Sequence, residues 1–369
     1  IWHPFTQHSN CRDHIYIKSS GGAYLYDNNN RKIFDAISSW WVNLHGHCHP
    51  KIADAISEQA RILEHVIFAE VVHEPAAKLA KNIISVLPKN MSKMFFSDNG
   101  STAVEVALKL AIQYWSNQKI KKSKILALSG SYHGDTFGAM SVAERNTFNE
   151  PFWSYLFDVE FLPSPKRGTD HSGYLSYLQK TIEKRDDVAA FIYEPLVQGA
   201  GGMLMHDGNL LESVLKCLRQ QNILLIADEV MTGFGRTGSW FASDYLETKP
   251  DFICLSKGLT GGFLPLSLTV TSKSVFEVFL SNDNSKTFFH GHSYTANPIA
   301  CAAANASFSL MSGESTWQSI DFISRSHDSF INYLYESKYK AYFSDMRKQG
   351  TILALEFTSD KKNGGYFNS

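Results

Sequence analysis

The chain has 369 residues, 44% of them hydrophobic, which is enough for one large and one smaller domain with buried cores. Its 35 Lys and Arg residues nearly balance 36 Asp and Glu residues, so no basic excess indicates nucleic acid as a partner. No apolar run approaches the roughly 20 residues that span a bilayer, which argues against a membrane protein and favours small molecules or proteins as partners.

The cysteine pattern favours a reducing compartment. The cysteines are odd in number, scattered, and form no C-x-x-C pair, so a disulfide framework is not expected. The segment from Ile1 to Phe5 lacks the basic-then-apolar pattern of a signal peptide, and we expect a cytoplasmic protein. The cysteines are Cys11, Cys48, Cys217, Cys254 and Cys301.

The first predicted elements are a hairpin and a helix. Strands over residues 22–27 and 32–36 flank the turn 28–31. Residues 51–66 carry apolar side chains at helical spacing, and Pro50 stands where this helix would begin.

Three histidines surround a cysteine between these elements, a composition that is also found in metal sites. His45, His47 and His49 flank Gly46 and Cys48, but no complementary C-x-x-C or H-x-x-x-H pair occurs. The segment reads as a turn into the following helix. We therefore predict structural hydrogen bonds for these histidines, and no metal.

From residue 94 onward, short apolar runs alternate with longer amphipathic stretches. Continuous apolar strands separated by helices are typical of a largely parallel sheet with helices on both faces. Such sheets bind ligands at the carboxyl ends of their strands. The predicted strands cover residues 94–96, 125–128, 188–193, 223–227, 252–255 and 266–270.

The segment 97–105 follows the first of these strands and opens a helix. Thr102 and Glu105 have capping-box spacing, which places the first free N–H groups of the helix near Gly100 and Ser101. Backbone donors and the helix dipole at this point suit a phosphate. An ordinary capped helix is an equally good interpretation of this segment alone.

Two further loops follow strands and carry polar or aromatic side chains. In the first, Tyr132 could stack on a planar cofactor and Asp135 could orient a neighbouring group. The second begins with Glu194 and continues into a glycine-rich turn. Each loop could also be an ordinary surface connection.

A glycine pattern at 233–238 matches the G-x-G-x-x-G motif, and Asp251 lies near the distance expected of a ribose-binding acid. However, five residues separate the pattern from the preceding strand, and no clear helix start follows it. We therefore disfavour a dinucleotide site.

The strand 252–255 is followed by the loop Ser256-Lys257-Gly258, and Asp228 follows the strand 223–227. A lysine that can form a Schiff base and an acid that can pair with a pyridinium nitrogen are what a pyridoxal-phosphate site requires. Taken alone, the tripeptide is far more typical of a surface loop.

Together these segments resemble the class III aminotransferases of fold-type I over nearly the full chain. The likeness is carried by D-E-V-M-T-G-F-G-R-T-G at 228–238, S-K-G at 256–258, and the ordered N-G-S, Y-H-G-D and E-P motifs. The resemblance implies an α/β fold, with a large pyridoxal-phosphate-binding domain (38–312) on a mostly parallel, seven-stranded-type sheet. A smaller α+β domain would come from both chain ends (1–37 and 313–369).

Within the family, the chain is most similar to members that act in biotin biosynthesis. The distinguishing segments lie at 2–6, 38–41, 132–142 and 197–203. This likeness implies conversion of 8-amino-7-oxononanoate to 7,8-diaminononanoate, with S-adenosylmethionine as amino donor.

The resemblance also implies roles for individual residues. Lys257 would carry pyridoxal 5'-phosphate covalently and move protons, Asp228 would contact its ring nitrogen, and Tyr132 would pack beside cofactor and substrate. Gly100 and Ser101 would hold the phosphate.

Further residues would bind the substrate or reach a second subunit. Trp40 and Trp41 would line the substrate pocket, together with Phe5, Tyr132, Lys257 and Gly291. The loop 290–293 matches H-G-x-[ST], so His292 and Ser293 would reach the phosphate of the neighbouring subunit in a homodimer with shared sites.

Two positions depart from the family pattern. Phe5 stands where many members have a tyrosine whose hydroxyl helps read the keto substrate, and some relatives that take lysine as donor have phenylalanine there. The carboxylate-binding arginine of the family would fall beyond Ser369, so we expect an incomplete C-terminal part. Lysine as donor, another ω-amino acid as substrate and, more remotely, a non-catalytic binding scaffold stay open as alternatives.

Overall fold

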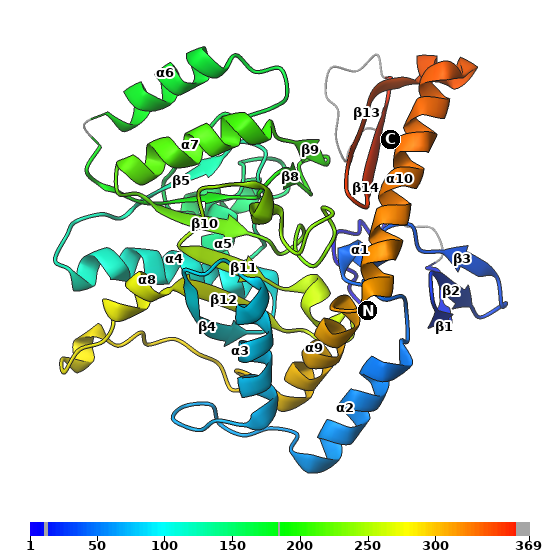
Figure 1. Ribbon diagram of the computed structural model, residues 1–369, viewed down its shortest axis with the longest axis horizontal. Helices are drawn as coiled ribbons and strands as arrows, with labels where there is room; N and C mark the ends of the chain where they lie inside the picture. Colours follow the sequence, from blue (N-terminus) through cyan, green and yellow to red (C-terminus); the bar gives the residue numbers. More distant parts are fainter. Residues whose placement is uncertain (11–13, 184, 359–369) are drawn as a thin grey trace.

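The computed structural model describes residues 1–10, 14–183 and 185–358. Figure 1 shows a central sheet with helices around it, and a long helix with several small strands to one side.

The central sheet has seven strands in the order β4-β12-β11-β10-β7-β5-β6. β12 runs antiparallel to both neighbours, and the other neighbouring pairs are parallel. The prediction of a mostly parallel, seven-stranded sheet is confirmed. The strands are β4 (Met91–Ser97), β5 (Lys124–Leu128), β6 (Val159–Leu162), β7 (Val188–Tyr193), β10 (Leu224–Asp228), β11 (Phe252–Leu255) and β12 (Ser267–Ser272).

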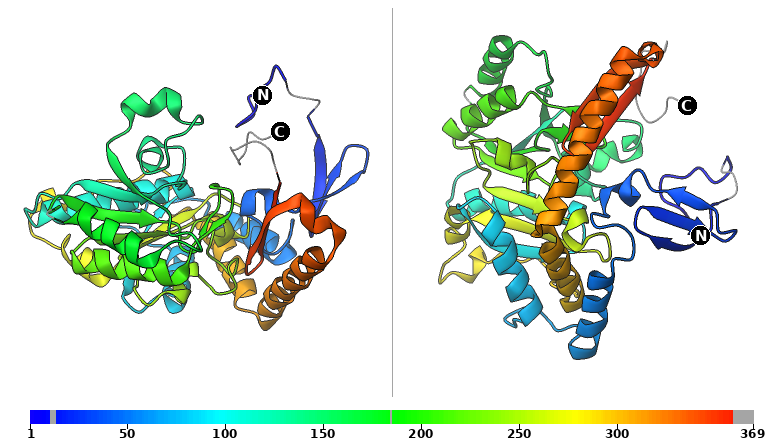
Figure 2. Two further views of the ribbon diagram at one scale, coloured as in Figure 1. Left: turned by 90° about the horizontal axis from the view of Figure 1, so that it is seen from above. Right: turned by 45° about the vertical axis from the view of Figure 1, so that its right-hand side comes forward.

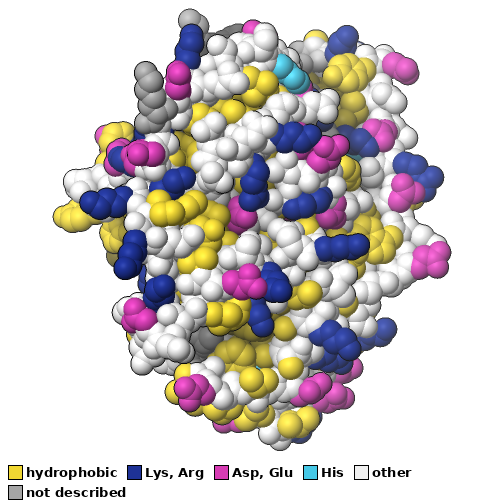
Figure 3. All heavy atoms as spheres, turned by 60° about the vertical axis from the view of Figure 1, so that its left-hand side comes forward, with side chains coloured by type: hydrophobic (Ala, Val, Ile, Leu, Met, Phe, Trp, Pro, Cys, Tyr) yellow, Lys and Arg dark blue, Asp and Glu magenta, His cyan; other side chains and the backbone are white. Residues whose placement is uncertain are grey.

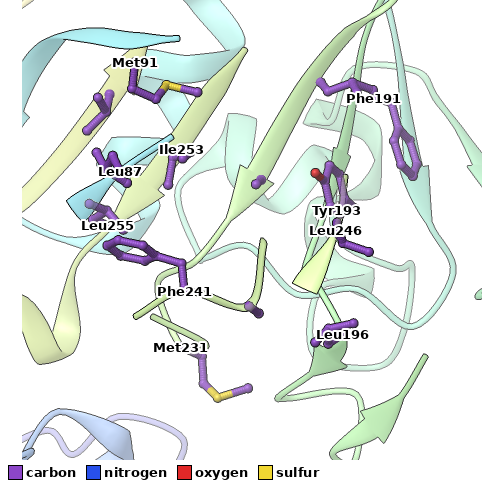
Figure 4. Close-up of a cluster of buried hydrophobic side chains, with 14 of the residues drawn as sticks. Leu87, Met91, Phe191, Tyr193, Leu196, Met231, Phe241, Leu246, Ile253 and Leu255 are labelled. Carbon is purple, nitrogen blue, oxygen red and sulfur yellow. The ribbon is translucent and has the colours of Figure 1, made fainter. Parts of the chain in front are cut away.

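The middle strands are buried on both faces, which explains their continuous apolar sequences. Every residue of β7, β10, β11 and β12 is buried. From Ala190 to Tyr193, successive side chains of β7 alternate between two apolar clusters, with Phe191 and Tyr193 in one and Ala190 and Ile192 in the other. Figure 4 shows part of the first cluster.

Helices cover the two faces of the sheet. α3, α6, α7 and α9 contribute to the cluster that contains Phe191, and α4, α5 and α8 to the opposite one. The α-helices are α1 (Ser38–Trp41), α2 (Pro50–Ile62), α3 (Glu74–Val86), α4 (Gly100–Asn117), α5 (Phe137–Ser141), α6 (His171–Ile182), α7 (Gly208–Gln220), α8 (Lys273–Glu277), α9 (Pro298–Met311) and α10 (Glu314–Glu336). The 3-10 helices are η1 (Glu150–Tyr155), η2 (Ala242–Tyr245), η3 (Lys257–Thr260), η4 (Asn284–Lys286) and η5 (Lys338–Tyr342).

Smaller antiparallel sheets complete the fold. β1–β3 form a three-stranded sheet, and β13 and β14 form a hairpin that lies with α10 on the same side of the molecule (Figures 1 and 2). β8 and β9 form a short ribbon beyond the end of β7. These strands are β1 (Ile17–Gly21), β2 (Tyr24–Asp27), β3 (Lys32–Phe34), β8 (Val197–Gln198), β9 (Leu204–Met205), β13 (Phe343–Gln349) and β14 (Ile352–Phe357).

The sequence predictions were wrong at some boundaries. The helix expected over 51–66 ends at Ile62, because Leu63 turns to an extended backbone with φ of −160°. β6 was missed because it is a short edge strand whose two middle residues are only partly buried. β13 was missed because its sequence is mostly polar. The division of the chain into domains at 38 and 312 stays a prediction.

Among the described helices, none has the length and apolar content that crossing a bilayer requires. On the face shown in Figure 3, basic and acidic side chains are interspersed, which fits the formal net charge of −1.

Candidate active site

Several predicted site residues lie at or just after the carboxyl ends of sheet strands that share one edge, namely Gly100, Ser101, Tyr132, Asp228 and Lys257. β5, β7, β10 and β11 are mutually parallel. Since β12 opposes both β11 and β4, β4 also runs in their direction, and its end at Ser97 lies at the same edge. The tertiary structure therefore gathers the loops after β4, β5, β7, β10 and β11 where doubly wound sheets bind ligands.

Lys257 stands at this edge, two residues after β11 ends, and its backbone has a strained φ of +44°. Its amine lies 5.7 Å from the centre of the Trp41 ring and has no hydrogen-bond or ion-pair partner among the described residues. Burial lowers the pKa of Lys257; Asp228 and Glu194 oppose the shift, and Arg236 adds to it. The lysine is thus a free amine with an increased tendency to be neutral.

Two close contacts explain the glycines in the lysine loop. A Cβ at Gly258 would lie 2.8 Å from the Leu44 side chain, and one at Gly262 would lie 2.6 Å from the Asn43 amide oxygen. The chain just after the tryptophan pair packs directly on the lysine loop, and side chains at these glycines would push it away.

Asp228 is buried and has two fixed hydrogen-bond partners. Its Oδ2 lies 2.6 Å from Nδ1 of His133, and its Oδ1 accepts the Val230 N–H at 3.0 Å. The side chain of His133 is fully buried, and its Nε2 has no partner among the described residues. Sequence reasoning gave His133 no role, although it stands next to Tyr132 in the Y-H-G-D motif.

Glu194 follows β7 and lies close to this pair. Its two oxygens accept the N–H groups of Tyr132 at 3.1 Å and Gly199 at 2.9 Å, which joins the loops after β5 and β7. Burial raises the pKa of Glu194 to about 7 and Asp228 adds to the rise, while His133 and the two N–H groups oppose it. A buried carboxyl with a pKa near neutrality is common at functional sites.

Tyr132 is partly exposed at the sheet edge. Its hydroxyl donates a 3.0 Å hydrogen bond to Oδ2 of Asp135, so Asp135 orients a neighbouring side chain as predicted. Burial, followed by the charge of Asp135, raises the pKa of the Tyr132 hydroxyl, which therefore stays protonated at neutral pH.

The start of α4 presents free backbone donors, but its cap differs from the expected one. The capping box joins Asn99 and Thr102, so the predicted pairing of Thr102 with Glu105 was wrong. The N–H groups of Gly100 and Ser101 have no acceptor within the described part of the chain. The first N–H groups of a helix have no partner inside the helix, so they are free to bind a ligand or water. This arrangement suits an anion.

Glu105 instead caps the following short helix. Its Oε1 accepts the N–H groups of Gly138 at 2.7 Å and Ala139 at 3.0 Å, together with the Thr136 hydroxyl at 2.5 Å. The Ser101 hydroxyl in turn contacts the Thr136 hydroxyl at 2.7 Å. The starts of α4 and α5 are therefore tied together around Ser101.

The paired tryptophans lie on an unusual turn, since four consecutive residues from Ser38 to Trp41 have φ between 48° and 64°. The left-handed conformation costs a non-glycine residue roughly 1–2 kcal/mol. Arg236 holds the end of the turn, because its Nη2 donates a 2.6 Å hydrogen bond to the Trp41 carbonyl. Sequence reasoning quoted Arg236 within a motif but gave it no role. Phe5 is exposed and packs edge-on against Trp40, with ring centres 5.6 Å apart.

The loop 290–293, which lies between η4 and α9, makes no hydrogen bond or ion pair with Lys257 in the described part of the chain. Gly291, His292 and Ser293 are exposed, and the hydrogen bonds of His292 are local, to Thr295 and Tyr294. Of the three histidines expected to make structural hydrogen bonds, His45 contacts Ser307 at 3.2 Å and His47 contacts Asp35 at 2.8 Å. The prediction is not met at His49, whose buried Nδ1 has no partner among the described residues.

A sequence model of the family described as "Aminotransferase class-III" matches residues 6–368. A Synechococcus elongatus protein named adenosylmethionine-8-amino-7-oxononanoate aminotransferase is 52% identical over 318 residues, which cover 84% of this chain and 75% of the relative. A Staphylococcus aureus protein of the same name is 37% identical over 98% of this chain and 83% of its own length.

Two solved structures superpose closely on this chain. The enzyme with that name from Methanocaldococcus jannaschii superposes with a TM-score of 0.91, at 34% identity, over 98% of this chain and 83% of its own. An amine transaminase from an uncultivated Pseudomonas species, in its PLP-bound form, has a TM-score of 0.91 at 28% identity, over 98% of this chain and 85% of its own.

Proposed function

We propose that this chain, which belongs to the class III aminotransferase family, transfers an amino group to 8-amino-7-oxononanoate to give 7,8-diaminononanoate in biotin biosynthesis. It is a pyridoxal-phosphate-dependent enzyme of fold-type I. The observation that carries the proposal is the amine of Lys257, which has no partner among the described residues, faces a tryptophan ring and interacts electrostatically with the buried Asp228.

The residues at the sheet edge fit this cofactor. The free N–H groups of Gly100 and Ser101 would bind the phosphate. Each Asp228 oxygen makes one hydrogen bond, and an ionised carboxylate has about four lone-pair sites, so it has room for a ring nitrogen. The aromatic face of Tyr132 would pack beside the ring.

When bound, pyridoxal phosphate supplies an aldehyde carbon that holds the amino group between half-reactions and a ring that takes up charge from the substrate carbon. Lys257 would bind the cofactor and then carry a proton between reacting atoms on its Nζ, which burial helps to keep neutral. Asp228, held by His133, would keep the ring nitrogen protonated. Trp40 and Trp41 would exclude water and orient the substrate.

The identity of the amino donor is tested by following the absorbance of the protein with bound pyridoxal phosphate. The half-reactions with S-adenosylmethionine and with L-lysine are measured in parallel. We expect S-adenosylmethionine to shift the spectrum and 8-amino-7-oxononanoate to restore it. No response to either donor, with a response to an unrelated ω-amine, would overturn the assigned reaction.

Lysine is the second candidate donor, favoured by one observation. Phe5 places a ring without a hydroxyl against Trp40, and the polar group that many relatives carry there is missing. A Phe5→Tyr variant should then move the preference toward S-adenosylmethionine. An unchanged ratio of the two half-reaction rates would contradict a role of Phe5 in donor choice.

We also propose a cytoplasmic homodimer in which Gly291, His292 and Ser293 reach the partner's site. Their exposure supports this role, as does the fact that their hydrogen bonds within the described residues stay inside the loop. Co-expression of Lys257→Ala with a His292→Asp/Ser293→Asp variant should recover about a quarter of the wild-type activity, because half of the dimers would each hold one intact site. Recovery of no activity from two folded dimeric variants would contradict shared sites.

A further inference from the structure

The turn from Ser38 to Trp41 must be held by specific contacts, because its four residues all have left-handed backbone angles. The two tryptophans of the proposed substrate pocket lie on this turn. What stabilises the turn therefore decides where Trp40 and Trp41 lie relative to Lys257.

Asp35 supplies the side-chain contacts that hold the front of the turn. Its Oδ1 accepts the Ser39 N–H at 3.0 Å, and its Oδ2 accepts the Ser39 hydroxyl at 2.7 Å. Its backbone carbonyl also accepts the Ser38 N–H at 3.3 Å. The side chain of Asp35 is only 6% exposed, whereas Ser39, which donates both side-chain bonds, lies at the surface.

His47 fixes the carboxylate of Asp35 from the other side. Its Nε2 lies 2.8 Å from Oδ2 of Asp35, and its Nδ1 lies 3.4 Å from the Asn43 amide nitrogen. Because an amide nitrogen can only donate, Nδ1 is the acceptor and Nε2 carries the hydrogen directed at Asp35. The backbone of His47 pairs with Gly22, which anchors the histidine beside the first small sheet.

The same group of residues contacts the lysine loop. Asn43, which contacts His47, also lies against Gly262, where a Cβ would come within 2.6 Å of its amide oxygen. Asp35, Ser39, His47 and Asn43 thus form a continuous set of contacts from the tryptophan turn to the loop of Lys257.

We propose that Asp35 is a positioning residue that, through Ser39 and His47, holds Trp40 and Trp41 in place for the keto substrate. It acts on the turn and not on the reacting atoms. This role rests on the proposed function, because it concerns how the same proposed site binds its keto substrate.

The first test is hydrogen exchange of the peptide 36–44 in the purified protein. Asp35→Ala removes three side-chain bonds, two to Ser39 and one to His47. It should speed exchange of these amides at least about tenfold, which corresponds to the loss of one hydrogen bond to a charged group. Asp170→Ala is the matched control, since Asp170 also accepts both the N–H and the hydroxyl of one serine, Ser172, but at the start of α6 on the far side (Figure 1). Equal exchange over 36–44 in Asp35→Ala and wild type would overturn the proposal.

The second test separates binding from catalysis. Asp35→Ala should raise KM for 8-amino-7-oxononanoate about tenfold and leave kcat and the bound pyridoxal phosphate, read from absorbance, nearly unchanged. Asp35→Asn, which keeps an acceptor for Ser39, should rescue part of the effect. Asp170→Ala should match wild type. An unchanged KM despite faster exchange would overturn the role in substrate positioning.

If Asp35→Ala does not fold, Ser39→Ala provides the same test by removing only the 2.7 Å bond to Oδ2 of Asp35. Both exchange and KM should then change in the same direction as expected for Asp35→Ala, and no change in either would refute the proposal. If the wild-type protein does not aminate the keto acid at all, the proposed function is wrong, and exchange alone decides whether Asp35 holds the turn.

Discussion

The amine of Lys257 has no partner in the described part of the chain, and burial lowers its pKa; both properties favour a neutral, reactive amine. A neutral amine can attack a carbonyl carbon and can accept a proton, whereas an ammonium group can do neither. The nearby carboxylates of Asp228 and Glu194 limit the shift, so the lysine can both take up and return a proton.

Lys257→Ala should lower kcat by at least about a thousandfold, because it removes both the covalent attachment and the proton carrier. The measurement is steady-state amination of 8-amino-7-oxononanoate. Lys216→Ala, which removes an exposed lysine paired with Glu212 and Glu247, should leave the rate unchanged. A rate within tenfold of wild type for Lys257→Ala would contradict the assignment.

Glu194 makes the stability of the protein depend on pH. Its pKa is about 7 in the folded chain and near its ordinary 4.5 when unfolded, so the folded chain binds the extra proton between these values. The free energy of unfolding of wild type, relative to Glu194→Gln, should therefore fall as pH rises from 4.5 to 7, by at most about 1.4 kcal/mol per pH unit.

Urea unfolding of wild type and Glu194→Gln at pH 5 and pH 8 measures this difference. Other titrating groups cancel because both proteins contain them. A difference that is the same at both pH values would show that Glu194 titrates normally.

At the scale of elements, the start of α4 depends on close contacts between loops. A Cβ at Gly134 would lie 2.3 Å from the Ser101 hydroxyl oxygen, and the φ of Gly134 is +128°. Only glycine allows the loop after β5 to approach the helix terminus this closely.

Gly134→Ala should displace Ser101 and raise Kd for pyridoxal phosphate about tenfold, equivalent to one lost hydrogen bond to a charged group. Absorbance titration of the cofactor-free protein measures Kd. Gly168→Ala is the control, because Gly168 has a φ of +81° but no neighbour within 4 Å. An equal Kd for both variants would disprove the effect of the close contact.

The capping of α4 shows why motif spacing is an incomplete guide to an element. Thr102 and Glu105 have the spacing of a capping box, yet Asn99 provides the cap and Glu105 bonds to the start of α5. Both pairings agree with the local sequence, and the proximity of α5 in space selects one of them.

At the scale of the whole molecule, the β13–β14 hairpin packs on the loop that carries Arg236. A Cβ at Gly350 would lie 2.3 Å from the Thr237 carbonyl carbon, and Thr351 donates both its N–H and its hydroxyl to the Arg236 carbonyl. Since Arg236 also bonds to the Trp41 carbonyl, this packing connects the hairpin with the turn that carries the proposed substrate-binding tryptophans.

Gly350→Ala should destabilise the protein more than Gly22→Ala, although both glycines have a φ of +58°. The backbone angle alone should cost about 1 kcal/mol at either position. Steric overlap should add roughly 1–3 kcal/mol at Gly350, whereas Gly22 has no neighbour within 4 Å. Urea unfolding measures the two free energies, and equal losses would contradict the close packing.

The sequence by itself determined six of the seven strands of the sheet, all but the edge strand β6, and the motifs of the proposed site. Buried parallel strands require continuous apolar runs, and Lys257, Asp228 and Tyr132 belong to short motifs, so both signals are local. The tertiary structure alone decided the partners of these residues: His133 lies 95 positions from Asp228, and Arg236 lies 195 positions from Trp41. The left-handed tryptophan turn was equally hidden, because serine and tryptophan do not favour such angles without Asp35, Arg236 and His47 around them. Contacts over such separations depend on the order in which strands meet, which no local pattern of residues contains.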